Sequence, residues 1–445
     1  GREVMRILPR TNDDVNEEWI SDKTRHVVDG LRTQRLDQPY VRVGGRLTLA
    51  SWTEAFAVIA NRVKTTAANK IGAIAGDLCG AEEMFALKDL MTRLGSANVD
   101  ARQDGAVIDP SWGRASYLFN ATIAGIEEAD ALLIVGANPR REAAVLNARI
   151  RKRWRQGNFP IALIGEKVDL TYTYDYLGAG AETLAGLGQS KFAEAFKAAK
   201  KPLIIVGAGV CARKDGAALA ALAAKAAADF GAVVEGWNGF SVLHTAASRV
   251  AALDLGLVPG AGGKTAAQMA DGGLDVLFLL GADEIDVAPG PFVVYIGTHG
   301  DRGAHRADVI LPAAAYPEKS AIYVNTEGRV QLANRAAFPP GDAREDWAIL
   351  RALSDVLGRK LPYDSLSALR QAMFAAHPHL MRIDAIAAGD AADIGKLARL
   401  SGTPDKAGLK SAISDFYFTN PIARASAIMA ECSALAHAAA KTAAE

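Results

Sequence analysis

The sequence predicts an α/β protein built from two doubly wound parallel sheets. Short β-branched or apolar runs that end in glycine recur along the chain, and each is too short for a helix. Because these runs lack period-two alternation, they are typical of strands buried on both faces. Helical stretches alternate with them, which favours parallel sheets. The predicted strands are residues 71–76, 131–136, 161–165, 202–207, 232–236, 275–281 and 292–297.

Two of the intervening helices have clear signals. Residues 81–95 begin with acidic residues, carry apolar residues at steps of three and four, and end at Gly95. Residues 216–231 form a second, Ala-rich helix. After about residue 345 strands become scarce and Ala-rich helices dominate, up to residues 425–445. That last helix either docks a partner or packs as an amphipathic helix on its own domain.

An internal echo suggests two units of one design. EEADALLIVGANP (127–139) and GGLDVLFLLGADE (272–284) share an acid, five or six apolar residues, Gly-Ala, and then Asn or Asp. Two related α/β units would explain the echo. The general pattern of a buried parallel strand that ends in a polar loop would explain it equally.

Length and charge narrow the function classes. The 445 residues predict two to four domains at roughly 150 residues each. Lys plus Arg and Asp plus Glu both number 50, so no electrostatic footprint for nucleic acid or an anionic membrane is present. No apolar run approaches the roughly 20 residues of a spanning helix. The start, GREVMRILPR, lacks an initiator Met and a signal-peptide pattern, so we expect a fragment that opens in a β-strand.

The cysteines predict no metal centre. Cys79, Cys211 and Cys432 are far apart and form no CxxC pair. An iron–sulfur cluster needs about four thiolates, and a structural zinc site also needs clustered ligands. An odd number of widely spaced cysteines fits a reducing compartment.

Two glycine loops follow predicted strands. Gly207, Gly209 and Ala212 fit the dinucleotide pattern GxGxxA. However, Asp215 and Gly216 predict a turn before the helix, so the helix end would lie far from the glycines; the candidate ribose-binding acid, Glu235, also comes late. The loop GANPRRE (136–142) is either a ligand-binding loop at the carboxyl end of a strand or a turn in which Asn138 and Pro139 terminate the strand.

No catalytic residue can be nominated from the motifs. His299 and His305 are six residues apart, and His377 and His379 are two apart, but neither pair comes with carboxylates in a ligand set. Solvated or capping histidines explain them. GxSxG, HExxH, Walker and EF-hand patterns are all absent from the sequence.

Long blocks of the chain resemble one family. They are GREVMRILPR, NEEWISDKTRHVVDGLRTQRLDQPYVR, SWTEAFAVIA, GRASYLFNATIAGIEEADALLIVGANPRREAAVLNARIRKRW, ADVILPAAAYPEKSAIYVNTEGRVQLANRAAFPPGDAREDW and SDFYFTNPIARASAIMAEC. In order from residue 1 to the tail, they look like the largest peripheral-arm subunit of proton-pumping NADH:quinone oxidoreductase, respiratory complex I. The resemblance covers the portion that follows the subunit's iron–sulfur region.

This resemblance implies a non-catalytic structural part that supports electron transfer from NADH to quinone through clusters held outside this chain. The chain alone is then expected to be inactive and to carry no cofactor, with the iron–sulfur clusters in the N-terminal part of the full subunit. Expected partners are that region and other peripheral-arm subunits, without nucleic acid or direct membrane insertion. The expected location is the cytoplasmic side of a bacterial inner membrane or the mitochondrial matrix side.

The same portion is similar to the molybdopterin oxidoreductases, which implies two Rossmann-like domains. In those enzymes Cys-x-Lys-Gly-Arg closes a [4Fe–4S] motif, and here the frame reads Ser21-Asp22-Lys23-Thr24-Arg25. A serine hydroxyl is a poor replacement for a thiolate on iron, so Ser21 marks a lost cluster-ligand position. The segment that would present a metal ligand, residues 100–116, has no cysteine, and Ser111 is its weak candidate. The resemblance makes Gly136, Asn138, Gly207 and Gly209 remnants of a pterin site.

The family pattern also implies an interleaved domain order. We expect an N-terminal β segment at 1–47, which is a remnant of the cluster-bearing domain. A discontinuous α/β domain follows at 48–108 plus 237–375, with an inserted α/β domain at 109–236. A helical tail covers 376–445.

The block NTEGRVQ, Asn325 to Gln331, has a structural reading. Asn325 and Gly328 suit a tight turn between two short strands. Glu327 and Arg329 are expected to pair, or to cap, across the domain boundary.

Two other functions stay open. A working pterin-dependent molybdenum or tungsten oxidoreductase would need a metal ligand and a final domain that the sequence lacks. KPLIIVGAG (201–209) with AVVEGWNG (232–239) resembles the central domain of thiamine diphosphate enzymes. Fold-level similarity of α/β units explains that second likeness.

Overall fold

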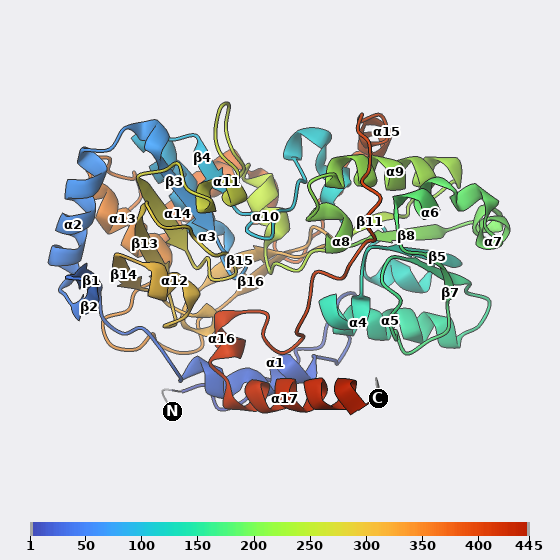
Figure 1. Cartoon of the computed structure of the whole chain (residues 1–445), viewed down its shortest axis with the longest axis horizontal. Helices are drawn as coiled ribbons and strands as arrows, with labels where there is room; N and C mark the ends of the chain where they lie inside the picture. The colour runs from blue at the N-terminus through green and yellow to red at the C-terminus, as the bar shows by residue number, and fades with distance from the viewer. Residues whose placement is uncertain (1–2, 443–445) are drawn as a thin grey trace.

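The computed structural model describes residues 3–442 and consists of two α/β units side by side, each with its own sheet (Figure 1). The first unit has a seven-stranded sheet of order β2-β1-β14-β13-β12-β3-β4. The hairpin β1–β2 joins it antiparallel to β14, and the remaining pairs are parallel. Its strands are β1 (Tyr40–Val43), β2 (Arg46–Leu49), β3 (Ile71–Ala75), β4 (Asn98–Asp100), β12 (Val276–Leu280), β13 (Phe292–Gly297) and β14 (Val309–Pro312).

The second unit has a five-stranded, wholly parallel sheet of order β11-β8-β5-β6-β7. The chain leaves β5 to form β6 on one side and later returns to form β8 on the other. The loops after β5 and β8 therefore flank the topological switch point, where α/β sheets bind ligands. The strands are β5 (Ala131–Val135), β6 (Ile161–Ile164), β7 (Asp175–Gly178), β8 (Pro202–Val206) and β11 (Phe240–Val242).

Helices cover both faces of the first sheet. Four of them pack together on one face, and the other face is covered by α11 (Ala266–Ala270) and α12 (Arg302–Arg306). The first group is α2 (Trp52–Lys64), α3 (Ala81–Leu94), α13 (Asp346–Val356) and α14 (Leu366–Ala376). Local signals set their ends: Ser51 and Glu54 form a capping box at the start of α2, and Gly95 ends α3 with φ +77°.

The second sheet is also covered on both faces. Two of its helices are single turns that directly follow strands, α4 (Pro139–Glu142) after β5 and α8 (Ala208–Cys211) after β8. The longer helices are α5 (Ala144–Arg155) on one face, and α6 (Ala181–Ala185), α7 (Phe192–Ala198) and α9 (Gly216–Asp229) on the other.

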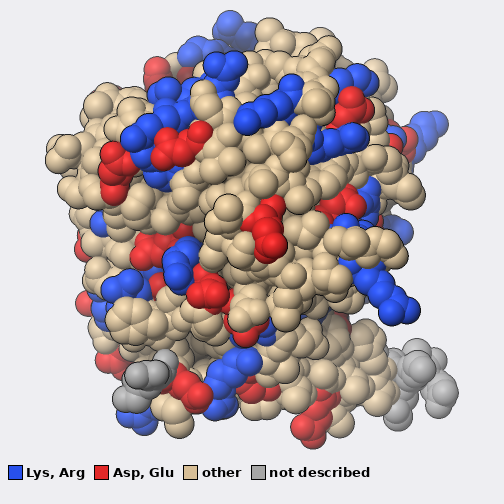
Figure 2. All heavy atoms as spheres, turned by 90° about the vertical axis from the view of Figure 1, so that its left-hand side faces the viewer, with Lys and Arg blue, Asp and Glu red and all other residues tan. Residues whose placement is uncertain are grey.

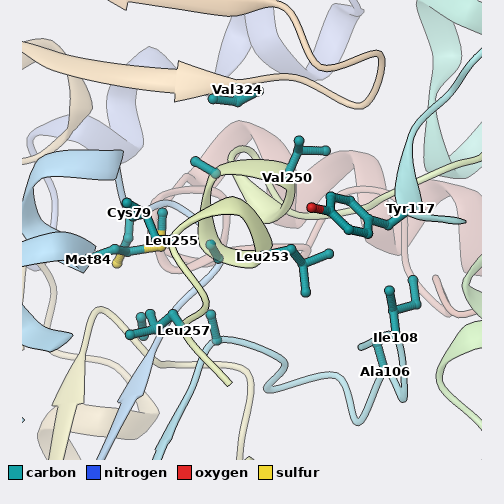
Figure 3. Packing of buried hydrophobic residues seen from close by; sticks show 14 of the residues in the cluster. Cys79, Met84, Ala106, Ile108, Tyr117, Val250, Leu253, Leu255, Leu257 and Val324 are labelled. Atoms are coloured by element: carbon teal, nitrogen blue, oxygen red, sulfur yellow. The ribbon is translucent and has the colours of Figure 1, made fainter. Parts of the chain in front are cut away.

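One hydrophobic core spans both units. Its middle is α10 (Arg249–Asp254), which Figure 3 shows between Met84 of the first unit and Tyr117 and Ile108 of the segment that leads into the second unit. Val250 and Leu253 are 1% exposed. The units are therefore joined by packed side chains.

Segments from near the two ends of the chain lie side by side along one side of the molecule (Figure 1). The last helix, α17 (Ala427–Thr442), contacts α1 (Asp22–His26) and η1 (Val27–Leu31). Met429 is 1% exposed there, so α17 packs on its own chain through one face. Before it come α15 (Ala392–Leu397) and α16 (Pro421–Arg424), separated by residues 398–420, which form no helix or strand.

Most predicted strands are confirmed, and one is wrong. Residues 232–236 do not join the parallel sheet, because Gly236, with φ +76°, turns the chain back on itself. Val233–Val234 (β9) then pairs antiparallel with Trp237–Asn238 (β10). The parallel edge strand is β11 instead. The start of the chain also differs from the expected strand, since residues 3–39 form none; the N-terminal β segment is the hairpin β1–β2.

The turn predicted at NTEGRVQ is confirmed. It connects β15 (Ala321–Val324) to β16 (Val330–Ala333), and Gly328 has φ +83°. The division into domains stays a prediction. In the structure, β1 and β2 share one sheet with β14, and β11 pairs with β8 in the other sheet. Within residues 3–442, no helix is both long and apolar enough to cross a membrane.

Candidate functional site

The two glycine loops predicted from the sequence meet at the switch point of the second sheet. The backbone amide of Gly209 donates to the carbonyl of Gly136, at 2.9 Å. A Cβ on Gly207 would lie 2.4 Å from the Cβ of Ala137, so glycine is required by the close approach. Gly136 has φ +58°. The structure thus brings Gly136, Asn138, Gly207 and Gly209 together at the carboxyl edge of the sheet, at a place here named the switch-point crevice.

A carboxylate lies inside this crevice. Glu142 of α4 accepts from the backbone amide of Asn138 at 2.8 Å. Burial raises the pKa of Glu142, while the amides of Asn138 and Ala208 oppose that shift. Asn138 is 5% exposed, and among the described residues its side-chain oxygen has no hydrogen-bond partner. Glu142 is the last residue of the stretch 136–142 that was considered as a ligand-binding loop, but no role in a site was assigned to it from the sequence.

The chain itself covers the crevice. Residues 405–411, here named the strap, run over the glycine loops on the way from α15 to α16. A Cβ on Gly209 would lie 2.1 Å from the carbonyl oxygen of Lys410. The Ser411 hydroxyl donates to Glu142 at 3.4 Å. Nothing in the sequence indicated that the tail returns to these loops.

Ser21 lies close to the crevice but serves as a helix cap. Its hydroxyl accepts from the backbone amide of Thr24 at 3.1 Å, at the start of α1. Ser21 and Lys23 line a hollow of about 370 Å³ together with Glu142 and Phe416. Burial lowers the pKa of Lys23 to about 8, and its ammonium donates to Thr419 at 2.8 Å.

The carboxyl edge of the first sheet carries a partly buried network of ion pairs. Arg424 of α16 lies 2.6 Å from Glu284 and 2.6 Å from Asp301, in the loops after β12 and β13. Arg249 contacts Asp104 at 3.0 Å. Glu284 ends the stretch GGLDVLFLLGADE (272–284), one of the two similar stretches found in the sequence. That similarity therefore indicated a polar loop at the carboxyl end of β12.

Glu284 predicts a pH dependence of stability. Burial raises its pKa from 4.5 to about 7, against the attraction of Arg424. The raised pKa means that the folded state holds this proton more tightly than the unfolded state, so the stabilisation is complete below pH 4.5 and is lost as pH rises through about 7. Relative to Glu284→Gln, the wild-type chain should lose up to about 3 kcal/mol between pH 4.5 and 8, measured by urea unfolding. Glu431→Gln, on an exposed site of α17, is the control and should leave the pH profile unchanged; an identical profile for Glu284→Gln would contradict the prediction.

The remaining candidates lie elsewhere. Ser111 is exposed on η3 (Pro110–Trp112), outside the crevice contacts. His299 is fully buried and bonds through Nε2 to the carbonyl of Gly30 at 2.8 Å. His379 differs from the expected solvated histidine, because it lies 2.9 Å from the buried carboxylate of Asp254. In the described part of the chain, no group of three or more His, Cys, Asp or Glu is placed to hold a metal ion.

Three family models match the chain. Residues 35–356 match the molybdopterin oxidoreductase model. Residues 383–432 match a model of the C-terminal region of the NuoG-type subunit of NADH-ubiquinone oxidoreductase. Residues 1–29 match a 4Fe-4S domain model of NDSU1/NuoG-like NADH-ubiquinone oxidoreductase, so a segment of an iron–sulfur domain family is present in this chain.

Curated relatives and solved structures agree with these matches. The 78 kDa subunit of mitochondrial NADH-ubiquinone oxidoreductase from Candida albicans is 48% identical over 97% of this chain and 61% of its own length. The mitochondrial iron-sulfur protein 1 of NADH dehydrogenase from Solanum tuberosum is 43% identical over 98% of this chain and 59% of its own length. The chain thus spans about 60% of such relatives. Acetylene hydratase from Pelobacter acetylenicus shares the fold, with a TM-score of 0.62 at 13% identity over 85% of this chain and 68% of its own.

Proposed function

Since the chain belongs to the molybdopterin oxidoreductase family, and within it is related to the large subunit of NADH-ubiquinone oxidoreductase, we propose that it is a non-catalytic structural part of that subunit. In this role its two α/β units brace an electron path from NADH to quinone that runs through clusters outside this chain. The 48% identity to the 78 kDa subunit over nearly the whole chain supports the proposal.

The observation that carries the proposal is the strap in the switch-point crevice. A pterin dinucleotide seated on the glycine loops would need the space that the Lys410 carbonyl fills beside Gly209. The donor set is also unsuited. Residues 100–116 contain no cysteine, and burial raises the pKa of the Cys211 thiol, in α8, to about 12. The residues present therefore do not fit this cofactor.

We further infer that residues 1–29 hold no cluster, although they match a 4Fe-4S domain model. The first cysteine of the chain is Cys79, so this segment has no thiolate to offer iron. The hydroxyl of Ser21, at the position of the lost ligand, is engaged as a helix cap. Clusters would then be bound in the iron–sulfur region of the full subunit.

The partners follow from this role. They are the iron–sulfur region of the full subunit and other peripheral-arm subunits, on the cytoplasmic side of a bacterial inner membrane or on the mitochondrial matrix side. The two named relatives are mitochondrial. On the face drawn in Figure 2, basic and acidic side chains are both present, in keeping with equal totals of 50 each. A mixed surface of this kind suits protein partners better than nucleic acid.

A working pterin-dependent molybdenum or tungsten oxidoreductase is the alternative. The match of residues 35–356 to the molybdopterin oxidoreductase model favours it. It would require the strap to leave the crevice and an exogenous group to supply the metal ligand.

Elemental analysis separates the two functions. The purified chain is analysed for Fe, Mo, W and Zn, with an absorbance spectrum and a fluorescence assay for released pterin; a purified molybdopterin enzyme serves as the positive control. We expect no metal in stoichiometric amount and no visible chromophore. Stoichiometric molybdenum or tungsten with pterin would overturn the proposal, and stoichiometric iron with visible absorbance would overturn its statement about residues 1–29.

A further inference from the structure

The strap is a surface segment with one buried side chain. Among residues 405–411 only Leu409 is buried, at 1% exposure, while Lys406 and Lys410 are exposed. The strap has no helix or strand of its own. Figure 1 shows the chain descending from α15 across the second unit and then turning towards α16. The strap is therefore attached to the rest of the chain by a few side-chain and backbone contacts.

An ion pair of the second unit holds the first half of the strap. Arg213 and Asp215 pair with each other at 2.7 Å, just after α8. Arg213 also donates to the carbonyl of Ala407 at 2.7 Å, and Asp215 accepts from the backbone amide of Asp405 at 2.7 Å. The side chains of Arg213 and Asp215 thus both form hydrogen bonds with the backbone of the strap.

Leu409 holds the second half. Its backbone amide donates to the carbonyl of Ala179 at 2.7 Å, and its side chain belongs to the main hydrophobic core. Its carbonyl oxygen lies 3.4 Å from where a Cβ of Gly165 would be, at the end of β6. The strap therefore passes over the loops of β6, β7 and β8.

Two carboxylates receive the end of the strap. The backbone amide of Ser411 donates to Glu166 at 3.2 Å, and its hydroxyl donates to Glu142 at 3.4 Å. Glu142 in turn accepts from the amide of Asn138 in the glycine loop. Strap and glycine loop are thus connected through one carboxylate.

We propose that the strap is a built-in occupant of the switch-point crevice: a releasable lid whose own backbone takes the place of a ligand on the glycine loops, with the Leu409 side chain as its apolar anchor. Residues 35–356, which match the molybdopterin oxidoreductase model, build the crevice. The strap comes from residues 383–432, which match the NADH-ubiquinone oxidoreductase model. A segment that matches the second model thus covers loops that match the first.

Release of the lid is expected to be local. A segment without regular structure, anchored by one apolar side chain, opens at a lower free energy than the core around it. When opening and closing are fast, cleavage by a protease follows the population of the open form. Lys406 and Lys410 offer two trypsin sites within the strap itself.

The test compares Leu409→Ala with Leu380→Ala in the full chain. Leu380 is 0% exposed and lies outside the strap, so its truncation removes the same atoms from a different part of the core. In Leu409→Ala, trypsin should cut after Lys406 and Lys410 about tenfold faster or more than in the wild-type chain. Hydrogen exchange of the 136–143 peptide should rise with it. Leu380→Ala should change neither.

A peptide added in trans makes the test specific for occupancy. A synthetic peptide of residues 403–413 should slow the exchange of the 136–143 peptide in Leu409→Ala, and the same peptide with Leu409→Asp should not. Equal rates of strap cleavage in Leu409→Ala and Leu380→Ala, or no protection by the first peptide, would overturn the proposal that the strap is a releasable lid. If Leu409→Ala does not fold, Arg213→Gln replaces it, with a smaller rise in cleavage expected. The outcome does not depend on metal content, which tests the proposed function separately.

Discussion

Replacing Lys319 with methionine is expected to lower the free energy of unfolding by about 3–5 kcal/mol, because it removes the cation that two buried carboxylates share. Lys319 is 6% exposed and lies 2.6 Å from Glu83 and 2.7 Å from Asp346. Glu83 belongs to α3 and Asp346 begins α13, so the ammonium joins two helices that cover the first sheet. Without it, the two carboxylates face each other across an apolar side chain.

Urea unfolding at pH 8 and pH 5 measures this effect. Burial already raises the pKa of Asp346 to about 6 in the wild-type chain. In Lys319→Met the carboxylate of Asp346 loses the nearby cation and takes up a proton more readily, so part of the lost stability should return at pH 5. Lys225→Met is the control. Its ammonium is exposed and lies 3.7 Å from Asp229, a surface pair worth at most about 1 kcal/mol. A loss in Lys319→Met no larger than in this control would contradict the expectation.

The sequence predicted the central strands because they are continuous apolar runs. β5 (Ala131–Val135) and β12 (Val276–Leu280) are buried at every position, so their composition alone identifies them. β4 (Asn98–Asp100) was missed because its polar composition is typical of a loop. Asn98 and Asp100 can be buried there because their side chains form hydrogen bonds with Ile71 and Ala266, which are remote in sequence. β9 was assigned to the wrong sheet because its composition is that of a buried strand. In the structure the turn at Gly236 reverses the chain, so β9 pairs with β10 instead.

The candidate site, like the fold, could be predicted from the sequence only in part. Gly136 and Gly207 follow strands, so local pattern and fold topology together indicate that their loops meet. The strap could not be predicted, since the stretch DKAGLKS has no periodicity and its contacts are remote in sequence. Arg213 and Ala407, for example, are 194 residues apart. The carboxylate of Glu142 was equally hidden, because an acid in the first turn of a helix is ordinary until the structure shows what it faces.

Replacing Arg329 with leucine should also cost about 3–5 kcal/mol, at the hairpin β15–β16. Arg329 lies 2.8 Å from Glu327, as the sequence led us to expect, and Glu327 is 1% exposed. The second oxygen of Glu327 accepts from the backbone amide of Ile123, in the segment that leads into the second unit. The pair therefore connects the two units, and leucine would leave a buried carboxylate without a cation.

A double-mutant cycle with Glu327→Gln separates the lost cation from the lost packing. Glutamine keeps an oxygen for the amide of Ile123 but carries no charge, so Arg329→Leu should cost much less in the Glu327→Gln variant than in the wild-type chain. Unfolding in urea gives the four free energies. Equal costs in the two backgrounds would mean that Arg329 acts through its bonds to Asp384 and Asp14 and not through Glu327. A large coupling would mean that Arg329 stabilises the chain through the charge of Glu327, so that this ion pair adds to the packed side chains that join the two units.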